Sequence, residues 1–425
     1  MTPDEVIILN DFAAQNGGAS VVAIRSAVEL ARQGVRVTYF SAVAPTDPAL
    51  VGVPGLEVVC LGQEEIVHDP NRLRALVRGA WNRPAARALD RVLRTRDPAR
   101  TVVHAHLWMK ALSPAVFAPA FARRFPVVVT LHDFFAACPN GGFYVYPAQE
   151  ICHRRALSWD CVTCRCDRRS YPQKLWRVGR TLLQKHRARM PARVAHFVGV
   201  SEFATDILRP YLPTGVPTTV VRNPIDRADL GPAAVADHAP FVFAGRLVPE
   251  KGPRLFAEAV RRAGVPAVFV GDGELRGELE RDFPEVTITG WETPEAVDAR
   301  LRTARALVFP SRWYETLGLV AVEAAANGVP TVVSDGCAAR ETVADGVRGL
   351  HFRAGSVESL AEKLRSLADA PALAARLGRA AYDWYWSDPW TSARHVEDLL
   401  VVYRRTLAAQ ADRSLSKLHA SSSVP

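Results

Sequence analysis

The stretch ALVFPSRWYETLGLVAVEAAANGVPTVVS, residues 306–334, places a helix-forming segment between two short apolar runs. The runs 306–309 and 331–334 are bounded by prolines, which predicts two short buried strands. Between them, residues 319–326 are strong helix formers that end at an Asn-Gly pair. A strand, a helix and a second strand in this order predict a parallel βαβ unit.

Two glutamates lie in this unit, eight positions apart, with Gly318 between them. Glu315 lies near the helix N-terminus, and Glu323 lies deeper on the helix. Free N–H groups at a helix N-terminus favour a phosphate, and carboxylates accept hydrogen bonds from sugar hydroxyls. The pair therefore suits an anionic, hydroxyl-rich ligand. The alternative is that one glutamate caps the helix and the other is solvated, and the pair alone does not decide between these two interpretations.

The same alternation of apolar runs and helical patterns extends over most of the chain. We expect strands at 6–10, 35–41, 101–106, 127–132, 196–201, 241–245, 267–271, 286–289, 306–309 and 331–334. Such alternation is typical of α/β folds with a parallel sheet and helices on both faces. The pattern restarts after the proline-spaced stretch 211–217, and 425 residues exceed one ordinary core. We predict two doubly wound, Rossmann-like domains facing a central cleft.

The expected domain boundaries follow from these patterns. The first domain spans 1–216 and includes a cysteine-rich insertion at about 138–172, and the second spans 217–388. A helix at 389–411 carries one apolar stripe and is expected to cross back to the first domain. The tail 412–425 has little to bury and is expected to be disordered.

The net charge of +9 is concentrated in one segment. Residues 153–193 contain twelve Lys or Arg against two Asp, so the rest of the chain is close to neutral. No nucleic-acid motif accompanies this charge. The chain has no run of 18 apolar residues, and we expect no signal peptide at its start. We therefore expect a cytoplasmic protein.

Cations and glycines follow the expected strands of the second domain. Arg246 and Lys251 come just after a strand, five positions apart. Two cations at the end of a strand suit a diphosphate. The alternative is a surface turn with solvated charges. Gly271 and Gly273 follow the next strand and allow close approach of a ligand to the backbone. Trp291 follows another strand, where it either contacts a nucleotide base or packs in the core.

These four strand ends, with G-R-x4-K-G, V-G-x-G, T-G-W and P-S-x-W-Y-E-x7-E in this order, resemble the retaining GT-B glycosyltransferases of family four. The resemblance covers essentially the whole chain. It implies that Arg246 and Lys251 bind the donor diphosphate, that Glu315 contacts the donor sugar and that Glu323 contacts the ribose. The residues implied to complete the donor site are Gly17, Gly18, Gly271, Trp291, Thr316, Leu317 and Gly318.

In the first domain, the resemblance points to a glycine loop and a histidine. Gly17 and Gly18 open a helix after the first strand, where the family's glycine loop lies against the donor phosphate. His132 ends a strand and would contact the donor sugar or assist near the phosphate. His106 is a weaker candidate. A structural role is the alternative for each histidine.

Five of the seven cysteines lie at the insertion. Cys161 and Cys164 have the C-x2-C spacing of zinc ligands, and with Cys138 and Cys152 they would complete a tetrahedral structural site. Cys166 or His153 would be substitutes. The alternative is a set of reduced thiols packed in a loop.

The basic stretch 173–193 combines Leu175, Trp176 and Leu182 with many Lys and Arg. Such a helix could contact anionic lipid at the inner face of a membrane, or an acidic acceptor. The alternative is a packed helix that buries Trp176 and Leu182 and leaves a solvated cationic face.

The resemblance implies a retaining glycosyltransferase that moves a sugar from a UDP- or GDP-linked donor to an unknown acceptor hydroxyl, as in carbohydrate biosynthesis. The chain lacks an Asp-x-Asp motif, so we expect no catalytic metal. An epimerase or phosphorylase on the same fold is one alternative. A non-catalytic polyanion-binding protein is another, although we expect no nucleic-acid partner.

Overall fold

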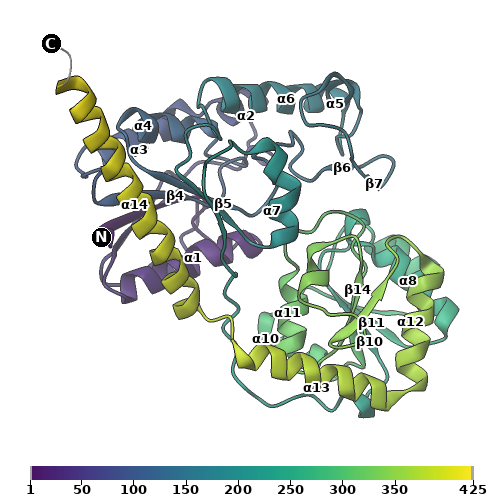
Figure 1. The fold of residues 1–425 in the computed structure, drawn as a ribbon. Coiled ribbons are helices and arrows are strands. Elements are labelled where there is room, and N and C mark those ends of the chain that lie inside the picture. The colour runs from purple at the N-terminus through teal and green to yellow at the C-terminus, as the bar shows by residue number, and fades with distance from the viewer. Residues whose placement is uncertain (1, 423–425) are drawn as a thin grey trace. The chain divides into compact units, whose positions relative to one another are not determined.

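The computed structural model describes residues 2–422 (Figure 1). Its chain divides into two compact units, each built on its own parallel sheet. The first unit contains residues up to 141, residues 154–224 and the chain from 392 onward. The second contains residues 142–153 and 225–391. The predicted α/β fold with two Rossmann-like units is confirmed.

The sheet of the first unit has the order β3-β2-β1-β4-β5-β8-β9 within the described residues. Its strands are β1 (Glu5–Phe12), β2 (Arg36–Val43), β3 (Leu56–Cys60), β4 (Thr101–Ala105), β5 (Val127–Leu131), β8 (His196–Gly199) and β9 (Thr218–Val220). All neighbouring strands are parallel. The central strands are buried on both faces, as their continuous apolar runs require.

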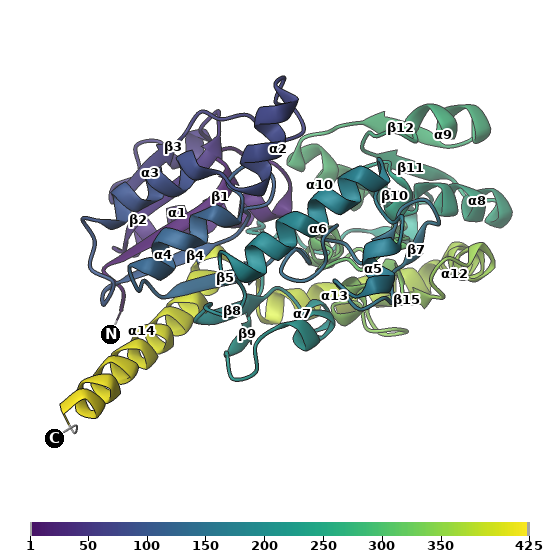
Figure 2. The ribbon, with the colours of Figure 1, turned by 90° about the horizontal axis from the view of Figure 1, so that it is seen from above.

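Helices cover both faces of this sheet (Figures 1 and 2). They are α1 (Gly18–Arg32), α2 (Arg72–Ala80), α3 (Arg83–Leu93), α4 (Phe117–Ala122), α5 (Trp159–Thr163), α6 (Tyr171–His186), α7 (Glu202–Leu208) and α14 (Ser392–Ser422). Helix α14 packs with α1, and Val396, Leu399 and Tyr403 join the core there. Figure 1 shows α2, α3, α4 and α6 on the opposite face from α1.

The second unit has a sheet of order β12-β11-β10-β13-β14-β15, again parallel, within the described residues. Its strands are β10 (Phe241–Ala244), β11 (Ala267–Val270), β12 (Thr287–Gly290), β13 (Ala306–Phe309), β14 (Thr331–Ser334) and β15 (Gly349–Phe352). Its helices are α8 (Pro253–Ala263), α9 (Arg276–Asp282), α10 (Pro294–Arg302), α11 (Leu319–Ala326), α12 (Val357–Asp369) and α13 (Pro371–Ser387).

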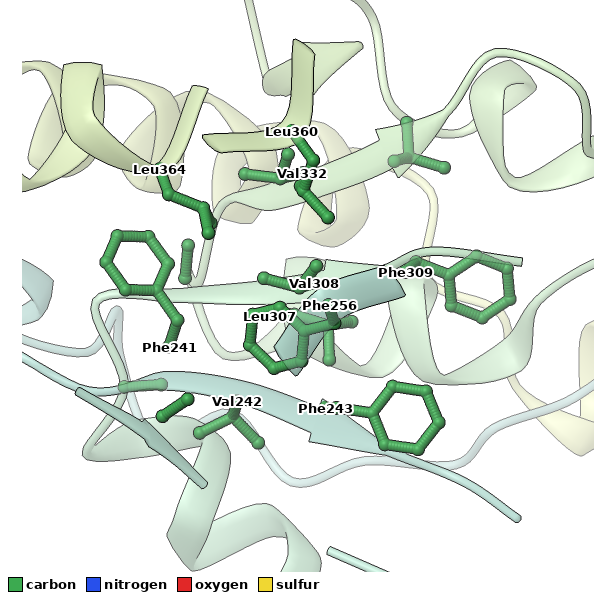
Figure 3. Packing of buried hydrophobic residues seen from close by; sticks show 14 of the residues in the cluster. Phe241, Val242, Phe243, Phe256, Leu307, Val308, Phe309, Val332, Leu360 and Leu364 are labelled. Atoms are coloured by element: carbon green, nitrogen blue, oxygen red, sulfur yellow. The ribbon is translucent and has the colours of Figure 1, made fainter. Parts of the chain in front are cut away.

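The core of the second unit is apolar and closely packed (Figure 3). Phe241, Phe256, Leu307, Val332 and Leu360 are fully buried between sheet and helices. A short hairpin of β6 (Tyr144–Val145) and β7 (Glu150–Ile151) also belongs to this unit. The remaining short 3-10 helices are η1 (Pro48–Leu50), η2 (Pro114–Val116), η3 (Arg209–Tyr211), η4 (Val235–Asp237), η5 (Pro249–Lys251) and η6 (Ala338–Glu341).

The structure differs from the sequence-based boundaries in four respects. Residues 142–153 of the predicted insertion belong to the second unit rather than to the first domain. The units meet at 224 and 225 rather than at 216 and 217, because β9 pairs with β8 in the first sheet. The edge strands β3, β9 and β15 were not predicted. Helix α14 continues to Ser422, where we expected disorder from 412, because Ala, Leu, Lys and Arg favour the helix. Residues 423–425 of that tail lie outside the described residues.

Candidate functional site

Three glycines bring the strand ends of the second unit into close contact. A Cβ on Gly252 would lie 2.2 Å from the Pro310 carbonyl oxygen after β13. A Cβ on Gly271 would lie 2.0 Å from the Gly245 oxygen, and both φ values are positive. Gly273 approaches the backbone of the β10 loop in the same way. The loops after β10, β11 and β13 therefore form one continuous surface, and no other residue fits at these glycines.

We expect Gly252→Ala to destabilise the second unit by about 2–4 kcal/mol, because the new methyl group collides with a carbonyl oxygen and the positive φ adds strain. Gly264→Ala is the matched control: its φ is +69° against +72° for Gly252, yet nothing lies within 4 Å of its added Cβ. Urea unfolding of both variants measures the difference. Equal losses of unfolding free energy would show that the contact with Pro310 does not matter.

Glu315 is the centre of a small polar cluster at this surface. Its Oε1 accepts hydrogen bonds from Ser311 Oγ at 2.9 Å and from Trp313 Nε1 at 2.7 Å, and it pairs with Lys251 Nζ at 2.5 Å. The Glu315 side chain is buried. Burial alone would raise the pKa of Glu315, but the Lys251 ammonium and these hydrogen bonds hold it below its ordinary value. Glu315 is thus a fixed carboxylate at neutral pH.

Arg246 and Trp291 follow β10 and β12, which lie on either side of β11, but they do not join this cluster. Arg246 is exposed just after β10, and in the described part of the chain its guanidinium makes no ion pair. The Trp291 side chain follows β12 and is 69% exposed. Neither residue is held by packing, so each is available to a ligand.

The helix α11 begins directly after the cluster. Gly318 is its N-cap, with φ of +92°, and a Cβ there would lie 2.9 Å from Ala339 Cβ. The positive φ turns the chain from the loop of Thr316 and Leu317 into the helix. N–H groups at the start of a helix lack a carbonyl partner four residues earlier and favour an anion, although here the Ala321 N–H already donates to the Gly318 oxygen at 3.0 Å. The predicted phosphate contact therefore has a suitable backbone geometry, although the structure does not test it.

Glu323 faces a cation that the sequence analysis missed. Arg227 Nη2 lies 2.9 Å from Glu323 Oε1, and Arg227 Nη1 lies 3.5 Å from Asp298 Oδ1. Asn327 Nδ2 donates to Asp298 Oδ1 at 2.6 Å and fixes this carboxylate. Arg227 is distant in sequence from the glutamate, in a segment without regular structure, so no local pattern indicated the pairing.

The hairpin from the cysteine-rich insertion contributes a second unpredicted contact. The Tyr144 ring packs edge-on against Trp313 at 6.5 Å between centroids. A Cβ on Gly142 would lie 3.2 Å from the Trp313 ring. Arg312 Nη1 donates to Gln149 Oε1 at 2.8 Å. The hairpin thus supports the loop that carries Glu315, a role that the spacing of the cysteines could not reveal.

In the first unit, three histidines lie at the ends of β4 and β5. His104 binds Tyr403 Oη and Thr130 Oγ1, each at 2.7 Å, and is completely buried, which is a structural role. His106 Nδ1 lies 2.9 Å from His132 Nε2. Burial lowers the pKa of His132 to about 3 and that of His106 well below its ordinary value, so both rings are neutral at pH 7.

This pair fixes the tautomer of His132. Among the described residues, His106 Nε2 is buried without a hydrogen-bond partner. A buried N–H without an acceptor is costlier than an unused lone pair, so the proton of His106 belongs on Nδ1. It is then donated to His132 Nε2, and the proton of His132 lies on Nδ1. Gly17, with φ of +83°, and Gly18 open α1 in the same unit and are exposed.

The cysteines do not form a metal site in this structure. No group of three or more His, Cys, Asp or Glu within the described residues is placed to hold a metal ion. Instead, the fully buried Lys174 places Nζ 3.5 Å from Cys161 Sγ, and Asn140 Nδ2 donates to Cys166 Sγ at 3.2 Å. Burial raises the pKa of Cys166 to about 11, which keeps it a thiol.

The zinc site on Cys138, Cys152, Cys161 and Cys164 therefore stays a prediction for metal analysis. If it forms, protein purified under reducing conditions without chelator should carry about one zinc per chain, and Cys164→Ser should lower both the zinc content and the thermal stability. Protein without zinc, and an unchanged Tm for the variant, would establish the thiols around Lys174 as the native arrangement.

Two family models match the chain in succession. The model described as Glycosyltransferase Family 4 matches residues 16–229, and that described as Glycosyl transferases group 1 matches residues 233–384. The chain is 30% identical over 284 residues to glycogen synthase of Mycobacterium tuberculosis, a match that covers 62% of this chain and 65% of that protein, less than two thirds of its length. It is 27% identical to D-inositol 3-phosphate glycosyltransferase 1 of Catenulispora acidiphila, over 92% of this chain and 91% of that one.

Solved structures show the same fold. Anabaena HepE in complex with UDP and glucose gives a TM-score of 0.65 at 17% identity, covering 94% of this chain and 99% of that one. Sucrose-phosphate synthase of Thermosynechococcus elongatus gives a TM-score of 0.69 at 17% identity, covering 95% and 99%. At this identity the likeness establishes the fold, which is GT-B.

Proposed function

Because the chain belongs to glycosyltransferase family 4, we propose that it transfers a sugar from a UDP- or GDP-linked donor to an acceptor hydroxyl with retention of configuration. The observation that carries the proposal is the Glu315 cluster with Lys251, Ser311 and Trp313. It places a fixed carboxylate and a cation at the strand ends of one unit, next to the start of α11. The UDP and glucose bound by HepE support a nucleotide-sugar donor.

In the proposed reaction, the bond between the anomeric carbon and the diphosphate oxygen breaks, and the acceptor oxygen bonds to the same face of that carbon. The leaving phosphate oxygen takes the acceptor proton, so no glutamate acts as nucleophile or base. Arg246, Lys251 and the first amides of α11 balance the charge that develops on the diphosphate. Glu315 accepts hydrogen bonds from the sugar, and Glu323, paired with Arg227, accepts them from the ribose. No metal ion is needed in this scheme.

The first experiment is a donor screen by hydrolysis and transfer. Purified protein is incubated with UDP- and GDP-sugars, with and without a mixture of simple acceptor alcohols, and the products are analysed by NMR. We expect release of one nucleoside diphosphate, and an α-linked product from an α-linked donor. A β-linked product would overturn retention, and consumption of donor without acceptor to give an isomeric nucleotide sugar would identify an epimerase instead. Release of a sugar 1-phosphate on addition of inorganic phosphate would identify a phosphorylase.

No helix among the described residues is long and apolar enough to cross a membrane. The cytoplasmic location, with peripheral contact at the inner membrane face, stays a prediction. A purely polyanion-binding role is not favoured, because the family match covers both units.

A further inference from the structure

Helix α6 is packed with its polar side inward. Its buried residues include Lys174, Arg180 and Gln184, while Leu175 and Leu182 are 43% and 41% exposed. The alternative of a packed helix that buries Leu182 is therefore wrong for this side chain. The helix thus presents two leucines to the solvent, which is unusual for a helix on the surface of a globular domain.

The buried polar groups of α6 explain this orientation. Arg180 Nη1 donates to the Met109 carbonyl oxygen at 2.6 Å, and Gln184 Nε2 donates to the Phe135 oxygen at 3.0 Å. Gln184 Oε1 accepts from Trp108 Nε1 at 2.9 Å. Each of these hydrogen bonds would be lost if the helix turned its leucines inward, so the exposure of Leu175 and Leu182 is a fixed feature of the fold.

The neighbouring helices also carry exposed apolar side chains. Helix α2 packs on α6 through Trp176, whose Nε1 donates to the Leu76 oxygen at 3.2 Å and whose ring lies against Gly79. Helix α5 contacts α6 on the same side of the unit (Figures 1 and 2). The exposed apolar side chains of the three helices are Leu73, Leu76 and Val77 on α2, Trp159 on α5, and Leu175 and Leu182 on α6. We call these six residues the apolar stripe.

The same segments are rich in cations. Helix α2 carries three arginines, of which Arg74 is paired with Asp69 at 2.7 Å, and residues 153–193 carry twelve Lys or Arg against two Asp. One of these acids, Asp167, is buried and paired with Arg177 at 3.1 Å, which leaves Asp160 as the exposed one. The exposed cations of α2 and of residues 153–193 are Arg72, Arg74, Arg154, Arg155, Arg165, Arg168, Arg169, Lys185, Arg187, Arg189 and Arg193.

We infer that α2, α5 and α6 form a docking surface for an anionic lipid bilayer. Apolar side chains on packed helices whose segments carry many cations and few acids match a membrane whose interior is apolar and whose headgroups are negative. A protein partner of ordinary composition would need neither the excess of arginine nor the absence of acids. The stripe would enter the interface while the long arginine side chains reach the phosphates. This surface lies wholly in the first unit, and its binding can be measured without any transferase activity.

The test is co-sedimentation of the full chain with vesicles of phosphatidylcholine alone and of phosphatidylcholine with an equal amount of phosphatidylglycerol. We expect binding to the anionic vesicles that is at least about tenfold stronger than to the neutral ones and that weakens as salt is raised from 50 to about 500 mM. Equal binding to both vesicles, or none to either, would overturn the inference.

Matched variants separate the apolar stripe from non-specific charge. Leu76→Ser with Val77→Ser should weaken binding by roughly tenfold, because two side chains no longer leave water. Val51→Ser is the control, since Val51 is 67% exposed in the same unit but lies beside α1, on the other face of the sheet. Circular dichroism and Tm establish that each variant is folded. Equal binding of all variants would mean that charge alone attracts the protein and would refute the docking surface.

A second copy of the chain is the competing occupant of this surface. Light scattering of the wild type should give a monomer mass that the Leu76→Ser/Val77→Ser variant does not change. A dimer that dissociates in this variant would show that the apolar stripe is a self-association interface, and it would replace the membrane in our inference.

Discussion

Replacing Glu315 by alanine should lower turnover by about 30- to 1000-fold while leaving the affinity for free nucleoside diphosphate within a few fold of the wild type. The reason is that Glu315 is expected to bind the reacting sugar, where a lost charge-assisted hydrogen bond costs roughly 2–4 kcal/mol. Its removal also frees Lys251, which pairs with it at 2.5 Å in this structure, to interact with phosphate. Steady-state kinetics and calorimetry with UDP and GDP measure the two quantities.

Glu323→Ala should show the complementary pattern, with weaker nucleotide affinity and a smaller loss of turnover. Glu258→Ala is a suitable control, because Glu258 is an exposed glutamate of the same unit that pairs only with its helical neighbour Arg254 among the residues described. Proportional losses of turnover and affinity in both the Glu315 and the Glu323 variant would refute the separate roles of sugar and ribose binding.

The pH dependence offers a further check on Glu315. Its pKa lies below the ordinary value, so the ion pair with Lys251 contributes stability that is present above the unfolded-state pKa and is lost as the pH falls through the folded-state pKa. Activity should therefore not lose an essential carboxylate between pH 5 and 8. Glu315→Gln, which cannot ionise, should narrow the gap in unfolding free energy between pH 7 and pH 3.

The sequence predicted the βαβ repeats well because buried parallel strands are continuous apolar runs, and such runs need no tertiary information to be recognised. It failed at β3 and β9, which are less buried edge strands, as the half-exposed Leu56–Cys60 illustrates, and at β15, a buried edge strand whose Gly-Leu-His-Phe sequence is not a continuous apolar run. It placed the boundary too early for the same reason, since Thr218–Val220 is assigned to the first sheet only by its pairing with β8.

The residues of the candidate site were also predicted only in part. Lys251 and Glu315 were found from their spacing to strand ends, and the fold brings them together because the loops after β10 and β13 meet at Gly252. Arg227 and Tyr144 were missed because each reaches the site from a distant segment through a tertiary contact. The inward polar face of α6 was also not predictable, since its amphipathic pattern is the same whichever side is buried.

The second large effect should come from Arg246 and Lys251, while EDTA leaves the wild type active. The diphosphate gains negative charge as the sugar departs, and without a divalent ion this charge must be met by fixed cations and helix amides. Arg246→Ala and Lys251→Ala should each lower turnover by about 100- to 1000-fold. Added Mg²⁺ should rescue neither variant, because the chain contains no Asp-x-Asp motif to hold it.

The two variants should differ in stability, and this difference separates catalysis from folding. Arg246 is exposed and makes no ion pair among the described residues, so its loss should leave the Tm unchanged, as should that of the surface control Arg262→Ala. Lys251→Ala leaves the buried Glu315 without its cation, so a lower Tm is expected, and Lys251→Ala with Glu315→Gln should recover part of it. Initial rates with EDTA and with Mg²⁺ or Mn²⁺ are decisive once a donor is known. A wild type that EDTA inactivates and Mg²⁺ or Mn²⁺ restores would show that a metal ion, rather than these two cations, stabilises the leaving diphosphate.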